Sequence, residues 1–383
     1  MIRLFASLFF LSSILSCDAQ NATRVLTGAD QLTELIPKLK NKKVGLVVNH
    51  TSLIGKTHLA DTLKSLGIKV VRIFGPEHGF RGTAADGEYV NDSIDAKTGI
   101  SVVSLYGKNR KPTAKQFADL DVVIFDIQDV GMRFYTYIGT MHYVMETCAE
   151  SKKKLILLDR PNPNSFVDGP INTKPLQSFV AMHPIPIAHG MTIAEMAQMI
   201  NGEGWLANKM KCDIEIIKLK NWTHSDEYIL PVRPSPNLPN QQAIKLYPSI
   251  CLFEGTVISL GRGTPSPFQV IGNPELKNMH YQFTPVTLKG IAVNPPQENK
   301  LCYGMDLRSV VVEPKIDLKY LLLMYNAYPD KEKFFLPYFD ILAGTPQLRQ
   351  LIKDGVTEDQ IRESWKSDLE KYKEIRKKYL LYP

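Results

Sequence analysis

Four short apolar runs constrain the fold of this chain more than any other feature of its sequence. They are "KKVGLVV", ending at Val48, "KVVRIF", ending at Phe74, "DVVIF", ending at Phe125, and "KLILL", ending at Leu158. Strands that are apolar throughout are typical of a parallel sheet that is covered on both faces. Segments with helical spacing lie between them, such as "HLADTLKSLG" and "YIGTMHYVMETCAESKKK". This alternation predicts an α/β fold with a Rossmann-like, doubly wound and mostly parallel sheet.

The second half of the chain begins with a well-marked helix. In "GMTIAEMAQMINGEG", Thr192 and Glu195 have the spacing of a capping box, so we expect a structural role for Glu195. The charged segment near the C-terminus begins with a similar pattern, from Thr357 to Gln360. Both patterns predict the first turn of an amphipathic helix.

A change of character after Pro274 indicates a domain boundary. The chain before it is rich in proline and glycine, whereas strand-like pieces such as "HYQFTPVTL" and then helices follow it. We therefore predict a Rossmann-like catalytic domain over residues 24–274. A smaller α+β domain over residues 275–383 is expected to contribute to the cleft.

The first residues are typical of an export signal. Arg3 precedes an apolar stretch too short to span a bilayer comfortably, and small or polar residues lead up to Cys17. We predict a signal peptide over residues 1–20 and a periplasmic or cell-envelope location. "ILSC" also resembles a bacterial lipobox, so membrane attachment through a lipidated Cys17 and plain secretion both stay open.

Composition and motifs argue against several functional classes. The 383 residues carry a formal charge of +7, but the lysines are spread along the chain and do not predict nucleic-acid binding. No GxGxxG follows the first strand and no P-loop occurs, which argues against a nucleotide site. The later cysteines form no CxxC pair, so we expect buried thiols or a single disulfide rather than a zinc site. They are Cys148, Cys212, Cys251 and Cys302.

Polar residues follow each of the four predicted strands. The segments are "NHTS", "GPEHGFRG", "DIQDVGMRFYTY" and "DRPNP". In open α/β sheets, ligands bind in the crevice beyond the carboxyl ends of the strands, so these loops should meet at one rim. We therefore expect residues that are far apart in the sequence to share one pocket.

The segment "GPEHGFRG" contains the strongest catalytic candidates, Glu77 and His78. Two carboxyl groups in a polar cleft can perform the acid and base steps of glycoside hydrolysis. Phe74 and Phe80 lie near Glu77 in the sequence and favour its protonated form, which a general acid needs. His78 is expected to orient Glu77, bind substrate or ligate a metal.

The second carboxylate is expected to be Asp126 or Asp129. Asp126 directly follows the third strand, and Asp129 lies further out. A structural role, with Asp126 capping or paired with Arg133, is the alternative. His50 and His78 could bind a metal with the aspartates, but no close pair such as HExxH occurs. We therefore predict neither a metal nor a cofactor.

We expect substrate to be held by these loops and by the proline- and glycine-rich segment that follows residue 233. Tyr135 and Tyr137 are two positions apart, hence on one face if extended, and aromatic faces stack well on sugar rings. Core packing is their alternative role. The predicted substrate-binding residues are Asn49, Arg81, Gln128, Arg133, Tyr135, Tyr137, Asn237, Glu254, Arg262 and Thr264.

A series of motifs, in order from about residue 25 to the end, resembles the bacterial exo-β-N-acetylmuramidase family. It includes "GPEHGFRG", "FDIQDVGMRFYTY", "LDRPNP", "PSPNLP", "LFEGT" and "GRGT". The resemblance implies an enzyme that removes β-1,4-linked N-acetylmuramic acid from the non-reducing end of peptidoglycan fragments during cell-wall recycling. At matching positions it favours Glu77 as a catalytic carboxylate, with His78 and the aspartates of "DIQDVG" close by.

Selectivity for N-acetylmuramic acid over N-acetylglucosamine is expected to depend on the lactyl carboxylate of the former. An arginine binds a carboxylate in a planar, bidentate pair. Arg262, between two glycines in "GRGT", and Arg81, directly after the Glu77 loop, are the predicted partners. Arg133 is expected to be occupied with Asp126 or Asp129.

Two other classes of protein fit parts of the pattern. An exported carbohydrate-binding or surface-assembly protein would keep the fold without turnover, but the intact Glu77, Asp126 and Asp129 argue against it. A metal-dependent hydrolase or esterase lacks both a ligand motif and a GxSxG elbow.

Overall fold

The computed structural model describes residues 24–82, 92–107 and 109–383. The predicted signal peptide, including Cys17, lies outside these ranges. In the described residues no helix is long and apolar enough to cross a bilayer. The later cysteines, Cys148, Cys212, Cys251 and Cys302, are free and buried, as one of the two alternatives expected.

The N-terminal part is built on a seven-stranded sheet with the order β11-β8-β7-β1-β4-β6-β5. Neighbouring strands are parallel, except that β5 runs antiparallel to β6. Read from β6 to β11, the parallel strands follow the order of a Rossmann fold, which confirms the predicted fold class. The strands are β1 (Val44–Val48), β4 (Val70–Gly75), β5 (Ser93–Ile94), β6 (Ser101–Ser104), β7 (Val122–Asp126), β8 (Lys154–Leu158) and β11 (Ile214–Ile217).

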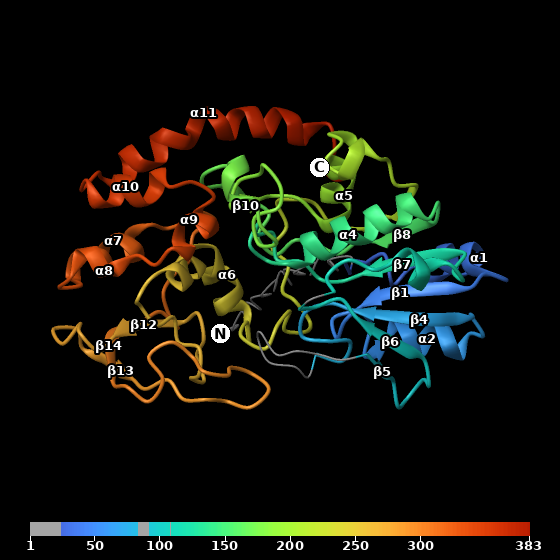
Figure 1. Cartoon of the computed structure of the whole chain (residues 1–383), viewed down its shortest axis with the longest axis horizontal. Coiled ribbons are helices and arrows are strands. Elements are labelled where there is room, and N and C mark those ends of the chain that lie inside the picture. Colours follow the sequence, from blue (N-terminus) through green and yellow to red (C-terminus); the bar gives the residue numbers. More distant parts are fainter. Residues whose placement is uncertain (1–23, 83–91, 108) are drawn as a thin grey trace, which may run out of the picture.

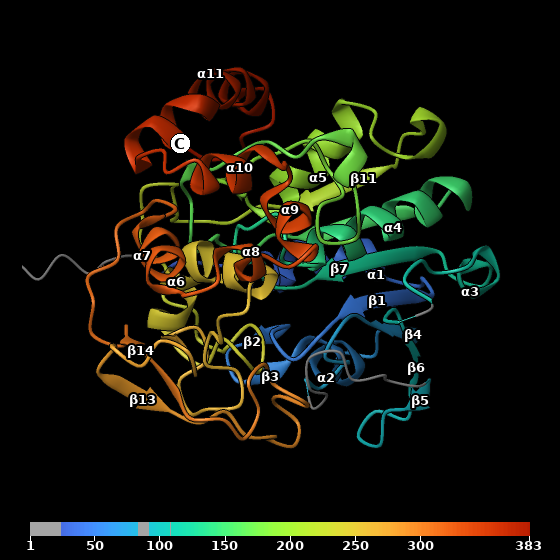
Figure 2. The ribbon, with the colours of Figure 1, turned by 60° about the vertical axis from the view of Figure 1, so that its left-hand side comes forward.

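Both faces of the sheet are covered, which explains why its strands are apolar throughout. Val47 and Phe125 belong to the larger hydrophobic core, together with residues of α4 (Tyr137–Glu150) and α5 (Ile193–Gly202). Residues of α1 (Leu32–Leu39) and α2 (Leu59–Ser65) belong to a second core on the opposite face. Figure 2 shows β7, β1, β4, β6 and β5 following one another across the sheet.

The C-terminal part combines a small antiparallel sheet with helices. The sheet has the order β12-β14-β13, and Figure 1 shows it below the C-terminal helices, beyond the tips of the parallel strands. The predicted boundary at residue 274 falls directly after β12. The bounds are β12 (Val270–Asn273), β13 (Tyr281–Phe283), β14 (Cys302–Asp306), α7 (Lys319–Ala327), α8 (Lys331–Phe334), α9 (Tyr338–Ala343), α10 (Gln347–Lys353) and α11 (Glu358–Lys377).

Short elements complete the fold. They are β2 (Leu53–Ile54), β3 (Thr57–His58), β9 (Val167–Asp168), β10 (Ala188–His189), α3 (Ala114–Phe117), α6 (Gln241–Ile250) and the 3₁₀ helices η1 (Lys174–Leu176), η2 (Ala207–Lys209) and η3 (Cys251–Gly255). In the lining of the pocket described below, α6 and η3 provide residues of the second wall.

Helix α11 runs along the top of the molecule in Figure 1, from the side of α10 toward α5. The Tyr372 hydroxyl donates to the carbonyl oxygen of His189 at 2.8 Å, and Arg376 Nε donates to that of Gly190 at 3.0 Å. The predicted capping boxes are confirmed at the starts of α5 and α11, with Thr192 and Thr357 as N-cap residues. The last helix of the chain is thus fixed to the part that carries the parallel sheet.

Candidate active site

A pocket of about 290 Å³ lies beyond the carboxyl ends of the parallel strands. One wall consists of residues that follow β4, β6 and β7, and the other of residues from the proline- and glycine-rich segment and from α9. The lining includes Glu77, His78, Tyr106, Arg110, Tyr135, Thr136, Tyr137, Phe179, Ser235, Asn237, Tyr247, Glu254, Arg262, Phe268 and Tyr338. The predicted rim of the sheet is therefore where the pocket is found.

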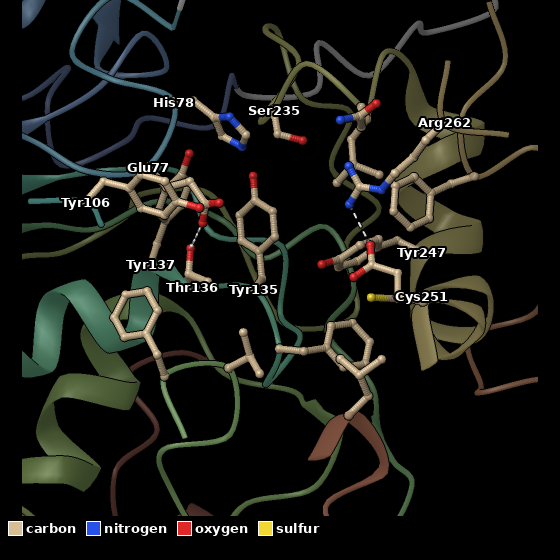
Figure 3. A pocket seen from close by; sticks show the side chains of 18 of the residues that line it. Glu77, His78, Tyr106, Tyr135, Thr136, Tyr137, Ser235, Tyr247, Cys251 and Arg262 are labelled. Atoms are coloured by element: carbon tan, nitrogen blue, oxygen red, sulfur yellow. Dashed lines mark hydrogen bonds and ion pairs between the residues drawn. The ribbon is translucent and has the colours of Figure 1, made fainter. Parts of the chain in front are cut away.

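Glu77 enters the pocket from a tight turn at the end of β4. The turn is closed by a hydrogen bond from Gly79 N to Pro76 O at 2.9 Å, and His78 has a left-handed backbone with a φ of 68°. A left-handed residue other than glycine is uncommon and tends to mark functional sites. The Thr136 hydroxyl donates to Glu77 Oε2 at 2.7 Å and fixes the carboxyl group (Figure 3).

Aromatic side chains line the middle of the pocket. The Tyr135 ring meets the rings of Tyr137 and Tyr247 edge to face, at centroid distances of 4.9 and 5.8 Å. Its hydroxyl donates to the carbonyl oxygen of Pro234 at 2.9 Å, across to the second wall. Burial raises the pKa of Tyr135 and Tyr137, and the nearby charge of Glu77 raises that of Tyr137 further. Both hydroxyls therefore stay protonated at neutral pH.

A charged pair lies at the end of the pocket away from Glu77. Arg262 Nη2 donates to Glu254 Oε1 at 2.5 Å, and its guanidinium lies 5.2 Å from the centroid of the Phe268 ring. Figure 3 shows Tyr135 between Arg262 and Glu77. Asn237 also lines the pocket and donates from Nδ2 to Ile291 O at 3.1 Å.

The aspartates that we predicted as second carboxylates do not line the pocket. Asp126 is fully buried and receives two hydrogen bonds from Arg160, at 2.6 Å from Nε and 2.9 Å from Nη2. Burial raises the pKa of Asp126, and Arg160 opposes this effect. Asp129 Oδ2 accepts from Gly131 N at 2.7 Å and lies 3.5 Å from His189 Nε2. Asp126 and Asp129 thus shape the loop after β7, and their catalytic role stays a prediction.

The loops that follow β1 and β7 are hydrogen-bonded to each other. Asn49 and Gln128, near the start of these loops, do not line the pocket. Thr51 Oγ1 donates to Asn49 Oδ1 at 2.6 Å and accepts from Gln128 N at 3.0 Å. The Gln128 side chain donates to the carbonyl oxygen of Pro161 at 2.7 Å. Contacts of Asn49 and Gln128 with substrate therefore stay a prediction.

Two of the three predicted arginines lie elsewhere. Arg81 pairs with Asp61 and Asp95, at 3.2 and 2.8 Å, beside a separate surface hollow. Arg133 is 1% exposed and donates to backbone carbonyl oxygens, including that of Leu342 at 2.8 Å, rather than to an aspartate. Burial lowers the pKa of Arg133 to about 9.

Thr264 has a local role in the loop that presents Arg262. Its hydroxyl donates to the carbonyl oxygen of Gly261 at 2.7 Å and accepts from Ser266 N at 3.1 Å. These bonds fold "GRGT" into a compact turn, and Thr264 itself does not line the pocket.

Several lining residues were not singled out from the sequence. Tyr106 and Arg110 follow β6, whose run "SVVS" is short and half polar. Tyr338 begins α9, far along the chain, and Phe179 lies in the segment between β9 and β10. Only the apolar "ISVVSLY" could have signalled a further strand and a further loop at the rim.

The histidines near the pocket do not form a metal centre. Among the described residues, no group of three or more His, Cys, Asp or Glu side chains is arranged to hold a metal ion. His183 and His189 are buried, and His183 Nε2 lies 2.9 Å from His142 Nδ1.

Comparison with known proteins identifies relatives over nearly the whole described chain. Family models described as the N- and C-terminal parts of exo-β-N-acetylmuramidase NamZ match residues 44–242 and 245–382. A peptidoglycan β-N-acetylmuramidase NamZ of Bacillus subtilis strain 168 is 38% identical over 397 residues, which covers 96% of this chain and 94% of the relative.

Two crystal structures of DUF1343 family proteins from Bacteroides fragilis have the same fold. One is 47% identical with a TM-score of 0.88, and the other 28% identical with a TM-score of 0.81. Each comparison covers 94% of this chain and 99% of the solved chain.

A Rossmann-like sheet that carries a carboxyl group in a pocket lined by tyrosines and arginines, together with these relatives, defines a glycoside hydrolase. The family models match nearly all of the described chain. The chain belongs to the exo-β-N-acetylmuramidase NamZ family. The family models divide the chain near residue 243, whereas our boundary at residue 274 stays a prediction.

Proposed function

We propose that Glu77 is the general acid with which this exo-β-N-acetylmuramidase releases β-1,4-linked N-acetylmuramic acid from the non-reducing end of peptidoglycan fragments. The observation that carries the proposal is the Glu77 carboxyl group, which lines the pocket and is fixed by Thr136 at 2.7 Å. In this step the Glu77 proton passes to the glycosidic oxygen while the bond from that oxygen to the anomeric carbon breaks.

The size and lining of the pocket support the removal of single sugars. Its volume of about 290 Å³ is at the lower end of the range for small-molecule sites, which suits one terminal sugar rather than a long glycan. Tyr135 and Tyr247 offer aromatic surface to the sugar ring, and Ser235 and Asn237 offer hydrogen-bonding groups from the opposite wall.

Of the carboxylates predicted as catalytic, Glu77 is the one that lines the pocket. Asp126 and Asp129 are buried and do not line it, and the carboxyl group of Glu254 accepts a hydrogen bond from Arg262. Glu77 is therefore the carboxyl group that we assign to the leaving oxygen, and His78, its neighbour on the turn, is proposed to orient it or the substrate.

The test is the substitution Glu77→Gln, which keeps the shape of the side chain and removes the transferable proton. We expect at least about a 10²-fold loss of turnover on an unactivated disaccharide, because general acid catalysis typically contributes about 10² to 10⁴-fold. A nitrophenyl glycoside, whose leaving group needs less protonation, should be affected less. Near-wild-type cleavage of the disaccharide by a folded E77Q variant would show that Glu77 is not the acid.

We also propose that the protein works in the periplasm or cell envelope, since its first residues are typical of an export signal. Membrane attachment would be through a lipidated Cys17. Cell fractionation tests the location, and recovery of the protein from the cytoplasm alone would contradict it.

A further inference from the structure

Arg110 is an arginine at the pocket that has no charged partner in the described part of the chain. Two arginines line the pocket, and Arg262 is neutralised by Glu254 at 2.5 Å. Within residues 24–82, 92–107 and 109–383, no hydrogen bond or ion pair engages Arg110, whose side chain is exposed. Among the described residues, therefore, no carboxylate compensates the positive charge of Arg110 at the proposed substrate pocket.

The guanidinium of Arg110 is nevertheless held in place. Its Cζ atom lies 4.4 Å from the centroid of the Phe179 ring, so the cation rests on an aromatic face. The Phe179 ring in turn stacks on Tyr143 at 6.1 Å, with 7° between the ring planes. A Cβ atom added to Gly139 would lie only 2.9 Å from Phe179, which shows how closely the ring packs on α4.

This stacking has a chemical consequence for Arg110. Contact with an aromatic face occupies the flat side of a guanidinium and leaves the N–H donors at its edge free to point outward. A planar fork of donors matches a carboxylate, which it binds through two parallel hydrogen bonds. The aromatic support therefore presents Arg110 to an anionic ligand.

Arg110 belongs to the same wall of the pocket as Glu77, the wall of residues that follow the parallel strands. It shares the loop between β6 and α3 with Tyr106, and Figure 3 shows the Tyr106 ring beside Glu77. Phe179, which supports Arg110, lines the same pocket. An anionic group on the sugar whose glycosidic bond is cleaved would thus lie in the same pocket as the Arg110 guanidinium.

We propose that Arg110 binds the lactyl carboxylate of N-acetylmuramic acid and so discriminates this sugar from N-acetylglucosamine, which lacks the lactyl group. The inference rests on the proposed function and names the residue that sets its specificity. It replaces the earlier expectation for Arg81, which is bound to Asp61 and Asp95, and for Arg262, whose charge is compensated by Glu254.

The test measures binding without turnover, in a Glu77→Gln background. The ligands are the methyl β-glycosides of N-acetylmuramic acid, of its uncharged lactyl amide, and of N-acetylglucosamine, titrated by calorimetry. Arg110→Met should weaken binding of the acid by about ten- to a hundredfold, the range for a lost hydrogen bond to a charged group. It should change binding of the amide and of N-acetylglucosamine little. Arg110→Lys keeps the charge without the fork, and an intermediate loss is expected.

Arg262→Met is the matched variant, because it removes the other arginine of the pocket. We expect it to weaken all three ligands alike. A selective loss for the acid in Arg262→Met, or an equal loss for acid and amide in Arg110→Met, would overturn the proposal. No loss in Arg110→Met would overturn it as well. A Glu77→Gln variant that still cleaved the glycosides would count against Glu77 as the acid, whereas the pattern of affinity losses tests Arg110, so the two failures are distinguishable.

Discussion

Glu77 depends on a residue 59 positions later in the chain. The Thr136 hydroxyl, at the start of α4, donates to its carboxyl group at 2.7 Å. Backbone hydrogen bonds fix the turn around Glu77, and the side-chain hydrogen bond from Thr136 sets the direction of its carboxyl group. A general acid must be positioned within hydrogen-bond reach of the leaving oxygen, so this contact should matter for the rate.

Thr136→Val replaces the hydroxyl by a methyl group of similar size and tests this contact. We expect about a tenfold loss of kcat on a disaccharide, because a free carboxyl group samples unproductive rotamers. The loss should be smaller on a nitrophenyl glycoside, which needs less acid assistance. Thr136→Ser keeps the donor and should retain activity. Equal losses on both substrates would indicate general damage to the pocket instead.

For single residues, the sequence predicts which side chains lie at the rim of the sheet, but it does not predict their contact partners. Glu77 and His78 were found because a glutamate and a histidine beside glycines after an apolar run have few packing reasons to be there. Asp126 satisfies the same reasoning, but it is buried in an ion pair with Arg160 and does not line the pocket. Its partner, Arg160, follows a different strand, and only the order of β7 and β8 in the sheet brings the two together.

The loop after β7 shows how one element determines the pocket wall. Gly131 has a φ of +82°, and a Cβ atom there would lie 2.3 Å from Asn162 Oδ1 in the loop after β8. Asn162 itself donates to the carbonyl oxygen of Met191 at 3.0 Å. Loops from neighbouring strands are therefore in close contact at Gly131, four residues before Tyr135.

Gly131→Ala should destabilise the protein for two reasons. A left-handed backbone costs a residue with a side chain about 1 to 2 kcal/mol, and the contact with Asn162 adds to this. Gly355→Ala is the matched control, since its φ is +71° but nothing lies within 4 Å of its Cβ position. Urea unfolding should show a larger loss for Gly131→Ala, with a loss of activity that Gly355→Ala does not share. Equal losses of stability would show that Asn162 moves aside freely.

The elements that were predicted correctly have local signals, and those that were missed do not. The four apolar strands and the capping boxes of α5 and α11 follow from residue patterns of about ten positions. The short strand β6 has two buried valines between serines, which is a weak signal, and Tyr106 and Arg110 were missed with it. The second wall could not be placed because proline- and glycine-rich loops carry no periodicity.

At the scale of the whole molecule, the C-terminal residues are fixed to the parallel sheet. The Tyr382 hydroxyl donates to Asp159 Oδ2 at 2.6 Å and accepts from Leu219 N at 2.9 Å. Leu381 N donates to Glu195 Oε1 at 2.8 Å. Asp159 follows β8, so the end of the chain contacts the rim of the sheet behind the pocket. Docking of these residues links the C-terminal part to the catalytic part.

This docking should make stability depend on pH through one buried carboxyl group. Burial raises the pKa of Asp159 to about 7, and the hydrogen bond from Tyr382 opposes this rise. Between its ordinary value of 3.8 and about 7, the folded protein binds a proton that the unfolded chain does not. The stability that Asp159 contributes is therefore present at low pH and is lost as the pH rises through about 7.

Asp159→Asn removes this titration, because the amide is neutral at every pH. The free energy of unfolding of both proteins is measured in urea from about pH 4 to pH 8. We expect the value for Asp159→Asn to increase relative to that of wild type as the pH rises, by at most about 1.4 kcal/mol per pH unit. Tyr382→Phe is the complementary variant. It removes a donor to the ionised carboxylate, so its deficit should grow above about pH 7. Parallel stability curves for wild type and Asp159→Asn would contradict a raised pKa at Asp159, since both proteins would then exchange the same number of protons on unfolding.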